Sequence, residues 1–406
     1  MAGRVAVIAR SVYGGRNGFA HVLSSMEASG ALRGPVAIVE GDPRPLARRF
    51  RERGYEPLIL YGVSTPAFLE VVGEIASVSR EFKVVVGGPH AVGAYWQVLR
   101  LGASAAVIGD GEAAAGYIVE WAAGERDLSE VPNVAYVDGG RFRTGRVELV
   151  DLDEYKPHYP PKELYPPIEI MRGCGFKCRF CQVPWEFKSS VRYRSPRAVE
   201  KAVRDYVASG RRSIRFVAPI GFAYMSRGDG PNVDAIEELL SRVRRAGGKP
   251  YLGSFPSETR PEYVTREVLR VVSRLAYNRR IALGLQSGRE RLLDSVSRGH
   301  GVEEVYRAVE IIHSHGLQAV VDIIMGLPGE TEEDVEATVR AMEALAGMGA
   351  RIRLHTFLPL PGTPLARARP GRIHEGYRRA VKKLLGRGVL EGSTAVRQYM
   401  SRASLS

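Results

Sequence analysis

Residues 171–181 decide how this chain folds, and they read Met171-Arg-Gly-Cys174-Gly-Phe-Lys-Cys178-Arg-Phe-Cys181. The three cysteines of this window are the only ones among the 406 residues. Thiolates with the spacing C-x3-C-x2-C can bind three irons of a cubane iron–sulfur cluster from one short loop. The fourth iron then has no thiolate ligand and is open to a substrate. We expect Phe180, which directly precedes the last cysteine, to pack beside the cluster.

Zinc and disulfide bonds are the alternative uses of these cysteines. A structural zinc site normally has four protein ligands, and no histidine stands at ligand spacing beside the window. His158 and the more distant histidines can contribute only through the fold. An odd number of cysteines leaves one unpaired, and the run Val5–Ile8 is too short for the apolar core of a signal peptide. We therefore expect an iron–sulfur loop in a cytoplasmic protein, with zinc as the alternative.

The size and charge of the chain narrow its class. A chain of 406 residues predicts two or three domains. No apolar run approaches the roughly 18 residues of a membrane helix, so we expect no transmembrane segment. The formal net charge of +13 suits an anionic partner such as RNA, a lipid surface or an acidic small molecule. The alternative is a charge spread over solvated faces, because no polybasic run concentrates it.

Residues 1–125 alternate short apolar runs with amphipathic segments such as 21–29 and 67–79. This alternation is typical of a Rossmann-like domain, in which helices cover a parallel sheet. The expected strands are Val5–Ile8, Val36–Val39, Leu58–Tyr61, Val84–Val86 and Ala106–Ile108. Ligands of such sheets bind at the carboxyl ends of the strands, where glycines and hydroxyl residues gather in this sequence.

Three of these strand-end segments read Gly62-Val-Ser64-Thr65, Gly87-Gly88-Pro89-His90 and Gly109-Asp110-Gly111-Glu112. Together they resemble the cobalamin-binding domain that precedes many radical S-adenosylmethionine (SAM) domains. The resemblance implies that cobalamin contacts Ser64, Thr65, Gly87, Gly88, Pro89, His90, Gly109, Asp110, Gly111 and Glu112. The D-x-H-x-x-G motif, which supplies a histidine to cobalt in classical members, is absent, since Phe19 stands two residues before His21. Cobalamin-dependent radical SAM members usually lack this motif too, so no histidine ligand is expected from that loop.

The remaining sequence predicts a connector and a second α/β domain. Residues 126–165 contain a hairpin pattern with an Asp-Gly-Gly turn and a proline-rich stretch that suits a semi-rigid strap. Strand and helix patterns then alternate again. The expected strands are Ile168–Met171, Ile214–Val217, Tyr251–Leu252, Ile281–Leu283, Ala319–Ile324 and Ile352–Phe357. Six such units predict a partial (βα)6 TIM barrel with its site at the carboxyl face of the strands.

This second domain resembles the radical SAM family. The cysteine window, Gly284-Leu-Gln286-Ser287, Gly326-Leu-Pro-Gly-Glu330 and Pro361-Gly-Thr-Pro364 occur in the family's order. The resemblance implies an α/β chain with four parts: a Rossmann-like cobalamin domain (1–125), the connector (126–165), a radical SAM barrel (166–370) and a C-terminal helical extension (371–406). It also implies a 4Fe–4S cluster on Cys174, Cys178 and Cys181, and SAM on the fourth iron. An external electron donor, flavodoxin- or ferredoxin-like, would reduce the cluster.

The resemblance also assigns residues to SAM and its surroundings. The SAM contacts it implies are Gln286, Ser287, Arg298, Ile324, Met325 and Leu358, the last three beside the adenine. Phe216–Ile220 replaces the family's glycine-glycine-glutamate motif and has no acidic residue, which puts the usual contact to the amino group in doubt. Glu258 and Arg260 are substrate candidates with an internal ion pair as the alternative. His355 is a further candidate, with a satisfied core histidine as the alternative.

The function implied by the resemblance is a cobalamin-dependent radical SAM enzyme, most often a methyltransferase at an unactivated carbon. Carbon–carbon coupling and rearrangement use the same cofactors and stay open, as does a cobalamin domain that only shapes the site. A tRNA methylthiotransferase is disfavoured, because those enzymes carry further cysteines in their N-terminal domain and this chain has none there. A zinc-stabilised RNA-binding protein is the non-enzymatic alternative. The positive charge of the chain favours an anionic substrate, and RNA, a lipid and a small molecule stay open as its class.

Overall fold

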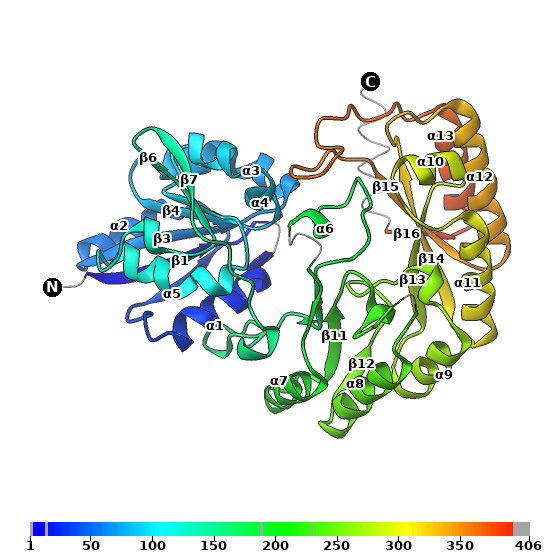
Figure 1. The fold of residues 1–406 in the computed structure, drawn as a ribbon, viewed down its shortest axis with the longest axis horizontal. Coiled ribbons are helices and arrows are strands. Elements are labelled where there is room, and N and C mark those ends of the chain that lie inside the picture. Colours follow the sequence, from blue (N-terminus) through cyan, green and yellow to red (C-terminus); the bar gives the residue numbers. More distant parts are fainter. Residues whose placement is uncertain (1–2, 13–14, 187–189, 229, 393–406) are drawn as a thin grey trace. The chain divides into compact units, whose positions relative to one another are not determined.

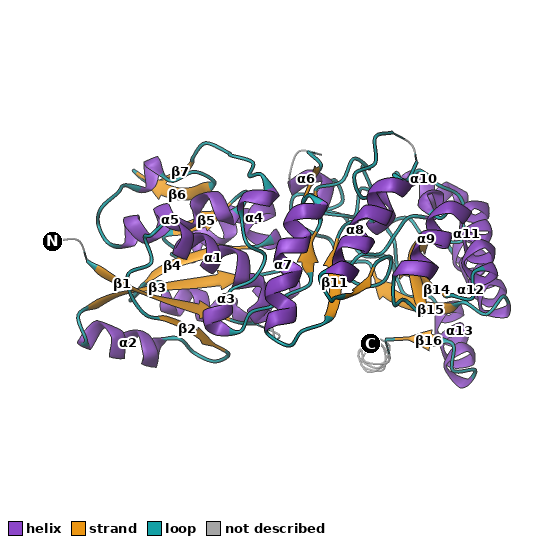
Figure 2. Cartoon of the chain, turned by 90° about the horizontal axis from the view of Figure 1, so that it is seen from below, coloured by secondary structure: helices purple, strands orange, loops and turns teal. Residues whose placement is uncertain are grey.

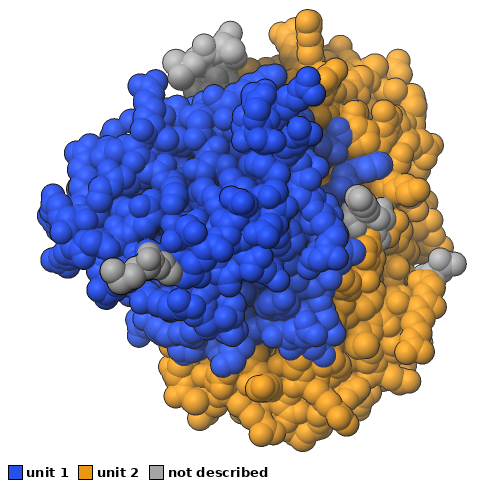
Figure 3. Space-filling model, turned by 60° about the vertical axis from the view of Figure 1, so that its left-hand side comes forward, with its two compact units in different colours: residues 1–166, 185–188, 360–363 blue, residues 167–184, 189–359, 364–406 orange. Residues whose placement is uncertain are grey.

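The computed structural model describes residues 3–12, 15–186, 190–228 and 230–392. The expected C-terminal extension is therefore described only up to residue 392. The chain divides into two compact units (Figure 3). The first comprises Met1–Pro166, Trp185–Lys188 and Leu360–Thr363, and the second comprises Pro167–Pro184, Ser189–Pro359 and Pro364–Ser406. No helix among the described residues has the length and apolar character needed to cross a membrane.

A seven-stranded sheet forms the centre of the first unit, in the order β2-β1-β3-β4-β5-β6-β7 (Figure 1). Its strands are β1 (Arg4–Arg10), β2 (Val36–Val39), β3 (Tyr55–Gly62), β4 (Lys83–Gly87), β5 (Ala105–Val107), β6 (Val134–Asp138) and β7 (Arg141–Thr144). Its helices are α1 (Ala20–Ala28), α2 (Arg44–Glu52), α3 (Thr65–Val78), α4 (Pro89–Arg100) and α5 (Gly111–Ala122). The first five strands are parallel, and β6 and β7 form the antiparallel hairpin that the sequence predicts.

The strands β1, β3, β4 and β5 are largely buried on both faces, which explains why they are apolar runs. Val5 and Val7 of β1 pack in one core with Leu23 of α1 and Ile118 of α5. The alternate residues Ala6 and Ile8 pack in a second core, together with residues of α2, α3 and α4. The chain passes from β1 to β2 on one side and then to β3 on the other. The carboxyl edge at this switch is where ligands of doubly wound sheets bind.

The second unit is built from parallel strands in two adjoining sheets, with the helices that follow them drawn in purple in Figure 2. The strands are β8 (Ile168–Glu169), β11 (Ser213–Val217) and β12 (Lys249–Tyr251) in one sheet, and β13 (Arg280–Gln286), β14 (Gln318–Met325), β15 (Arg351–Thr356) and β16 (Leu390–Glu391) in the other. A parallel bridge between Thr259 and Leu283 joins the two, so the expected partial barrel is present as an open set of parallel strands.

Helices connect these strands in the expected alternation. They are α6 (Val183–Glu186), α7 (Pro196–Ala208), α8 (Val233–Arg245), α9 (Arg266–Leu275), α10 (Glu290–Ser295), α11 (Val302–Ser314), α12 (Glu332–Gly347) and α13 (Glu375–Gly386). The side chain of Ser195 caps α7 by accepting a hydrogen bond from the Ala198 N–H, with Pro196 at the first helical position. Thr331 and Asp334 form the capping box that the sequence predicts at the start of α12.

Two strand predictions for this unit need correction. The run Ile168–Met171 is not one strand, because β8 pairs with β11 whereas β9 (Met171–Arg172) pairs antiparallel with β10 (Arg192–Tyr193). Ile170 lies at the break, where its N–H donates to the Val217 carbonyl and its own carbonyl accepts from the Arg194 N–H. The chain thereby leaves the parallel sheet just before the cysteine window. The prediction of six strands also missed β16, which adds Leu390 beside Ile352.

Candidate functional site

The cysteine loop follows directly from β9 and is fixed at both ends. Gly173 has a φ of +83°, and a Cβ at this position would lie 1.9 Å from the Ser190 carbonyl oxygen, so only glycine fits. Farther along, the Arg179 N–H donates to the Val296 carbonyl at the end of α10, over 2.9 Å. Cys174 and Cys178 are buried, and Cys181 is partly exposed. Burial raises the pKa of the Cys174 thiol.

All three cysteines line one cavity of about 200 Å³ in the second unit. Phe180 also lines it, and the ring packs against an apolar cluster formed by Leu292, Val296, Leu327 and Phe357. Three thiols that converge on one cavity, with an aromatic ring beside them, are a donor set that fits an iron–sulfur cluster. Phe180 therefore lies where it would pack beside a cluster held by these cysteines.

Two buried arginines contact the sulfur of Cys178. The Nη1 atoms of Arg260 and Arg298 each lie 3.6 Å from the Cys178 Sγ. The Arg260 guanidinium also stacks on the Phe176 ring, 3.6 Å from its centroid, and its Nε donates to Glu262 over 2.6 Å. Burial lowers the pKa of Arg298. Both arginines border the cavity. Arg298, expected at SAM, and Arg260, expected at the substrate, therefore lie together against the sulfur of Cys178.

His300 follows two residues after Arg298 and was not singled out in the sequence. Burial and the positive charge of Arg298 lower its pKa to about 3. The imidazole is therefore neutral at pH 7. No sequence signal identifies it, because the histidine lies in an irregular segment between two helices.

Gln286 ends β13 in the left-handed region, with a φ of +75°, and it lines the cavity. The space for its amide comes from Gly284, where a Cβ would lie 2.1 Å from the Gln286 Nε2. The Gly284 carbonyl accepts a hydrogen bond from Arg298 Nη2 over 3.0 Å. The glycine of the Gly-Leu-Gln-Ser motif thus allows Gln286 and Arg298 to occupy one wall of the cavity.

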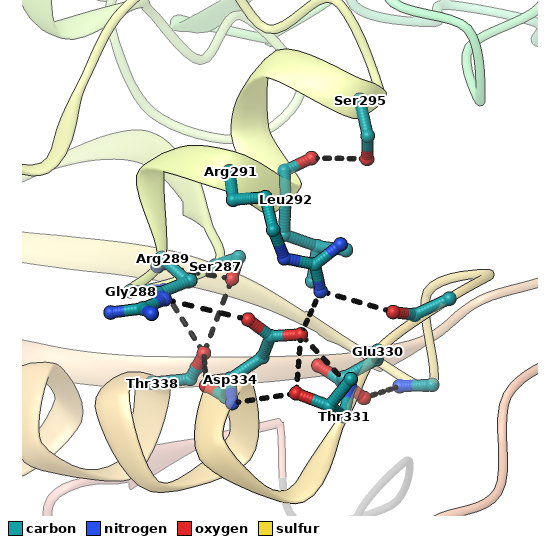
Figure 4. Close-up of polar contacts among 12 residues, drawn as sticks. Ser287, Gly288, Arg289, Arg291, Leu292, Ser295, Glu330, Thr331, Asp334 and Thr338 are labelled. Atoms are coloured by element: carbon teal, nitrogen blue, oxygen red, sulfur yellow. Dashed lines mark hydrogen bonds and ion pairs between the residues drawn. The ribbon is translucent and has the colours of Figure 1, made fainter.

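Ser287 has a different place, shown in Figure 4. Its side chain is fully buried, and the hydroxyl lies 3.2 Å from the Thr338 hydroxyl and accepts from the Arg289 N–H. Nearby, Asp334 of α12 binds Arg291 and Arg289 as ion pairs. These contacts hold the turn between β13 and α10 against α12. Ser287 does not line the cavity in the part of the chain that the structure describes.

The residues expected beside the adenine lie near the same apolar cluster. Ile324 packs against that cluster, Met325 is buried, and Leu358 is 39% exposed. Glu330 accepts from the Gly326 N–H over 2.8 Å and from the Tyr377 hydroxyl over 2.7 Å, so it shapes the glycine turn after β14. Burial raises the pKa of Glu330.

A charged network crosses the interior of the barrel strands. Arg353 of β15 pairs with Asp322 of β14 at 2.5 Å and with Glu258 at 2.8 Å. His355 Nε2 lies 3.4 Å from Asp322. The partners Arg353 and His355 hold the pKa of Asp322 below its usual value despite burial. Glu258 and Asp322 also line the cysteine cavity.

Sequence reasoning named Glu258 and His355 in this network but missed Asp322 and Arg353. An internal ion pair was the alternative to substrate binding for Glu258 and Arg260, and each residue pairs with a different partner, Glu258 with Arg353 and Arg260 with Glu262. His355 is exposed and not a core histidine. The sequence does contain a signal for the missed pair. Asp322 interrupts the apolar run Val320–Ile324, and arginines occupy alternate positions at the start of Arg351–Thr356. The strand register places Asp322 beside Arg353.

The ten residues expected at cobalamin all lie at or just beyond the carboxyl ends of three neighbouring strands, β3, β4 and β5. Gly88 has a φ of +94°, and a Cβ there would lie 2.7 Å from the Val63 carbonyl oxygen. His90 is 2% exposed, stacks on Phe68 with centroids 3.8 Å apart, and has Nδ1 3.2 Å from the Thr65 hydroxyl. Burial lowers the pKa of His90. The imidazole therefore belongs to the packing of the loop.

Asp110 and Glu112 hold the third of these segments. Asp110 is buried, and its Oδ2 accepts from the Val150 N–H over 2.9 Å. Glu112 lies 3.5 Å from His21 Nδ1. A Cβ at Gly109 would lie 2.8 Å from the Asn133 side chain. Asp110 and Glu112 therefore bind residues of neighbouring segments, and Gly109 allows the backbone of this strand end to pack closely against Asn133.

Comparison with known proteins supports this description. The model of the radical SAM superfamily matches residues 168–342. Among solved structures, the chain is similar to the radical S-adenosylmethionine methyltransferase TsrM from Kitasatospora setae, with cobalamin and a 4Fe–4S cluster bound. The TM-score is 0.69 at 18% identity, over 89% of this chain and 77% of that chain. The chain is also similar to the cobalamin-dependent S-adenosylmethionine radical enzyme OxsB with aqua-cobalamin bound. The TM-score is 0.64 at 17% identity, over 84% of this chain and 52% of that chain.

Two curated proteins resemble parts of this chain in sequence. A tRNA-2-methylthio-N(6)-dimethylallyladenosine synthase from Halorhodospira halophila is 26% identical over 65% of this chain and 59% of its own. A synthase of the same name from Chlorobium phaeobacteroides is 34% identical over 43% of this chain and 39% of its own length. The chain thus spans between 39% and 59% of the lengths of these two curated relatives.

Proposed function

The chain belongs to the radical SAM superfamily through its residues 168–342, and on this premise we propose that it is a cobalamin-dependent methyltransferase that acts on an unactivated carbon. The observation that carries the proposal is the cavity where the three cysteines, Gln286 and Arg298 meet. Its donor set suits a cluster, and its amide and guanidinium suit the polar end of a SAM molecule. The likeness in fold to structures with bound cobalamin extends the proposal to the first unit.

Cys174, Cys178 and Cys181 would hold the cluster, which when bound supplies one electron for the reductive cleavage of SAM. Gln286 and Arg298 would orient SAM from the wall at the end of β13. Phe180 and the apolar cluster behind it would exclude water from the reacting atoms. An external flavodoxin- or ferredoxin-like protein would deliver the electron.

Cobalamin would lie along the carboxyl edge formed by the ends of β3, β4 and β5. Gly88 supports this placement, because its positive φ and its close approach to the Val63 backbone fix the shape of the turn at this edge. His90 would contribute through its loop and not as a cobalt ligand, since its ring is buried against Phe68. When bound, cobalamin would supply a transferable methyl group at this edge.

Metal analysis tests the proposal. The full chain would be reconstituted anaerobically with iron, sulfide and hydroxocobalamin, desalted and analysed for iron, cobalt and zinc. We expect about four irons and about one cobalt per chain. The Cys174→Ala, Cys178→Ala and Cys181→Ala triple variant is the matched control and should lose the iron. Zinc alone would contradict the enzyme assignment, and iron without cobalt would contradict the cobalamin-dependent part.

Methylthio transfer is a second candidate, favoured by the sequence relatives. Against it, residues 1–166 contain no cysteine for a second cluster. Iron well above about four per chain would favour methylthio transfer, because a second cluster adds its own irons. Carbon–carbon coupling or rearrangement would use the same cavity and would appear as products without an added methyl group.

A further inference from the structure

A second, larger cavity in the same unit lies apart from the cysteines, and we call it the arginine basin. Its volume is about 870 Å³, within the range of small-molecule sites. Its lining includes the first residue of β13, Arg280, and the third residues of β14 and β15, Val320 and Arg353. The basin therefore opens toward the amino-terminal halves of these strands, whereas Gln286 and the cysteine cavity lie at the carboxyl end.

The basin carries more positive charge than its neighbours neutralise. Four arginines line it, Arg215, Arg279, Arg280 and Arg353, against one acidic residue, Glu391. Glu391 pairs with Arg280 over 3.2 Å, and Arg353 is paired with Asp322 and Glu258. Among the described residues, no carboxylate forms an ion pair with Arg215 or Arg279. Arg215 Nη1 donates to the Phe255 carbonyl over 3.2 Å, so its remaining N–H groups and the Arg279 guanidinium are available to an anion.

Aromatic rings alternate with these cations. The Arg215 guanidinium lies 5.0 Å from the Tyr251 ring centroid, and that of Arg353 lies 5.9 Å from the Phe255 ring. Tyr277, 6.3 Å from Tyr251, has Lys249 and Arg244 within 6 Å of its ring. Phe255 is 66% exposed and Tyr277 43%. Large rings kept at the surface of a cavity suit stacking with a planar ligand.

We propose that the arginine basin binds a nucleoside phosphate, with its base stacked on Tyr251 or Tyr277 and its phosphate on Arg215 and Arg279. Guanidinium forks suit phosphate oxygens, and every base offers a π-face to tyrosine. An acidic peptide would use the arginines but leave the rings without partners. A lipid tail would need an aliphatic wall, and the aliphatic lining here is limited to Ala282, Val320 and prolines. The proposal does not rest on the proposed chemistry at the cysteines.

Fluorescence anisotropy of the reconstituted full chain tests this site, with labelled oligouridylate and oligoadenylate as probes. Unlabelled AMP, UMP and tripolyphosphate serve as competitors. We expect either Tyr251→Leu or Tyr277→Leu, whichever removes the ring that holds the base, to weaken binding by about fivefold or more, since one stacked base is lost. Arg279→Gln should lower the slope of log affinity against log salt by about 0.7, the value for one phosphate contact to a single strand.

Matched controls come from the rest of the chain. Tyr117→Leu removes a half-exposed tyrosine that also faces an arginine, and Arg340→Gln removes an exposed arginine on α12. Both should leave affinity and salt slope unchanged. Competition by AMP or UMP would identify a free nucleotide as the ligand, and resistance to both would identify a single strand. Absence of binding, equal competition by tripolyphosphate, or tyrosine variants no weaker than Tyr117→Leu would overturn the proposal.

Discussion

At the scale of single residues, the environment of Cys178 shows how the chain tunes its candidate cluster. Two guanidinium groups lie 3.6 Å from one sulfur and are buried with it. Positive charge in a poorly solvated site stabilises the more negative redox state of its neighbour. Gaining an electron makes a cluster more negative, so these arginines favour its reduced form. Sequence spacing gives no hint of this pairing, because it joins residues 82 and 120 positions from Cys178.

We predict that Arg260→Met lowers the reduction potential of the reconstituted cluster. Methionine keeps an apolar stem over Phe176 but removes one charged hydrogen bond to Cys178. Such bonds contribute about 1.5–3 kcal/mol, which corresponds to roughly 60–130 mV for one electron. A redox titration followed by electron paramagnetic resonance measures the change. Arg307→Met, on the exposed face of α11, is the control. An unchanged potential at full iron content would contradict the tuning role.

Glu186 gives a prediction on pH. Burial raises the pKa of this carboxyl from 4.5 to about 7, and its Oε1 has no hydrogen-bond partner among the described residues. Below pH 4.5 the group is protonated in the folded and unfolded chain, so it has no effect. Between pH 4.5 and about 7 only the unfolded chain ionises, so stability falls as the pH rises and stays lower above that range.

Glu186→Gln should therefore raise the melting temperature at pH 8 and leave it unchanged near pH 4.5. The expected gain at pH 8 is roughly 2 kcal/mol after allowance for partial solvent screening. Differential scanning calorimetry at the two pH values measures it. A gain of equal size at both values would show that the effect does not come from ionisation.

At the scale of elements, one glycine decides how a segment packs on a helix. The first unit includes Leu360–Thr363, and Gly93 of α4 faces it. A Cβ at Gly93 would lie 2.3 Å from the carbonyl oxygen of Pro361, a backbone atom that cannot rotate away. The Pro-Gly-Thr-Pro sequence after β15 is thus positioned by a helix that lies more than 250 residues earlier in the sequence.

We predict that Gly93→Ala destabilises the protein by about 1–3 kcal/mol, the usual cost of overpacking. Gly73→Ala is a close control, since Gly73 lies inside α3 with no heavy atom within 4 Å of its added Cβ. That change should be neutral or stabilise by up to about 1 kcal/mol through helix propensity. Thermal unfolding of both variants measures the difference. Equal melting temperatures would contradict the packing argument.

The elements also show how far sequence patterns reach. Apolar runs predicted the parallel strands of both units because buried parallel strands are apolar on both faces. Patterns failed where the backbone bends within an apolar run, as at Ile170, and where a strand has only two residues, as in β16. The grouping of the three cysteines with Phe180 could be predicted, because all four residues lie within one short loop of the sequence. Asp322 and Arg353 were missed because their pairing depends on the register of two strands.

At the scale of the whole molecule, each candidate cofactor site draws its residues from one unit. The cysteine cavity is lined entirely by residues of the second unit, and the edge at β3, β4 and β5 belongs to the first. Each unit has its own buried core, so each can keep its site when the other site is changed. Loss of one cofactor should therefore leave the binding of the other intact.

Reciprocal variants test that independence. The cysteine-to-alanine triple variant should lose iron but bind hydroxocobalamin as the parent does. Gly88→Val should weaken cobalamin binding by at least about tenfold, roughly 1.4 kcal/mol, while iron content stays unchanged. Valine is strained at a φ of +94° and would meet the Val63 backbone. Gly54→Val, also at positive φ but with open space around its Cβ, controls for strain alone. Absorbance titration and metal analysis measure both cofactors, and joint loss in either variant would mean that the two sites depend on each other.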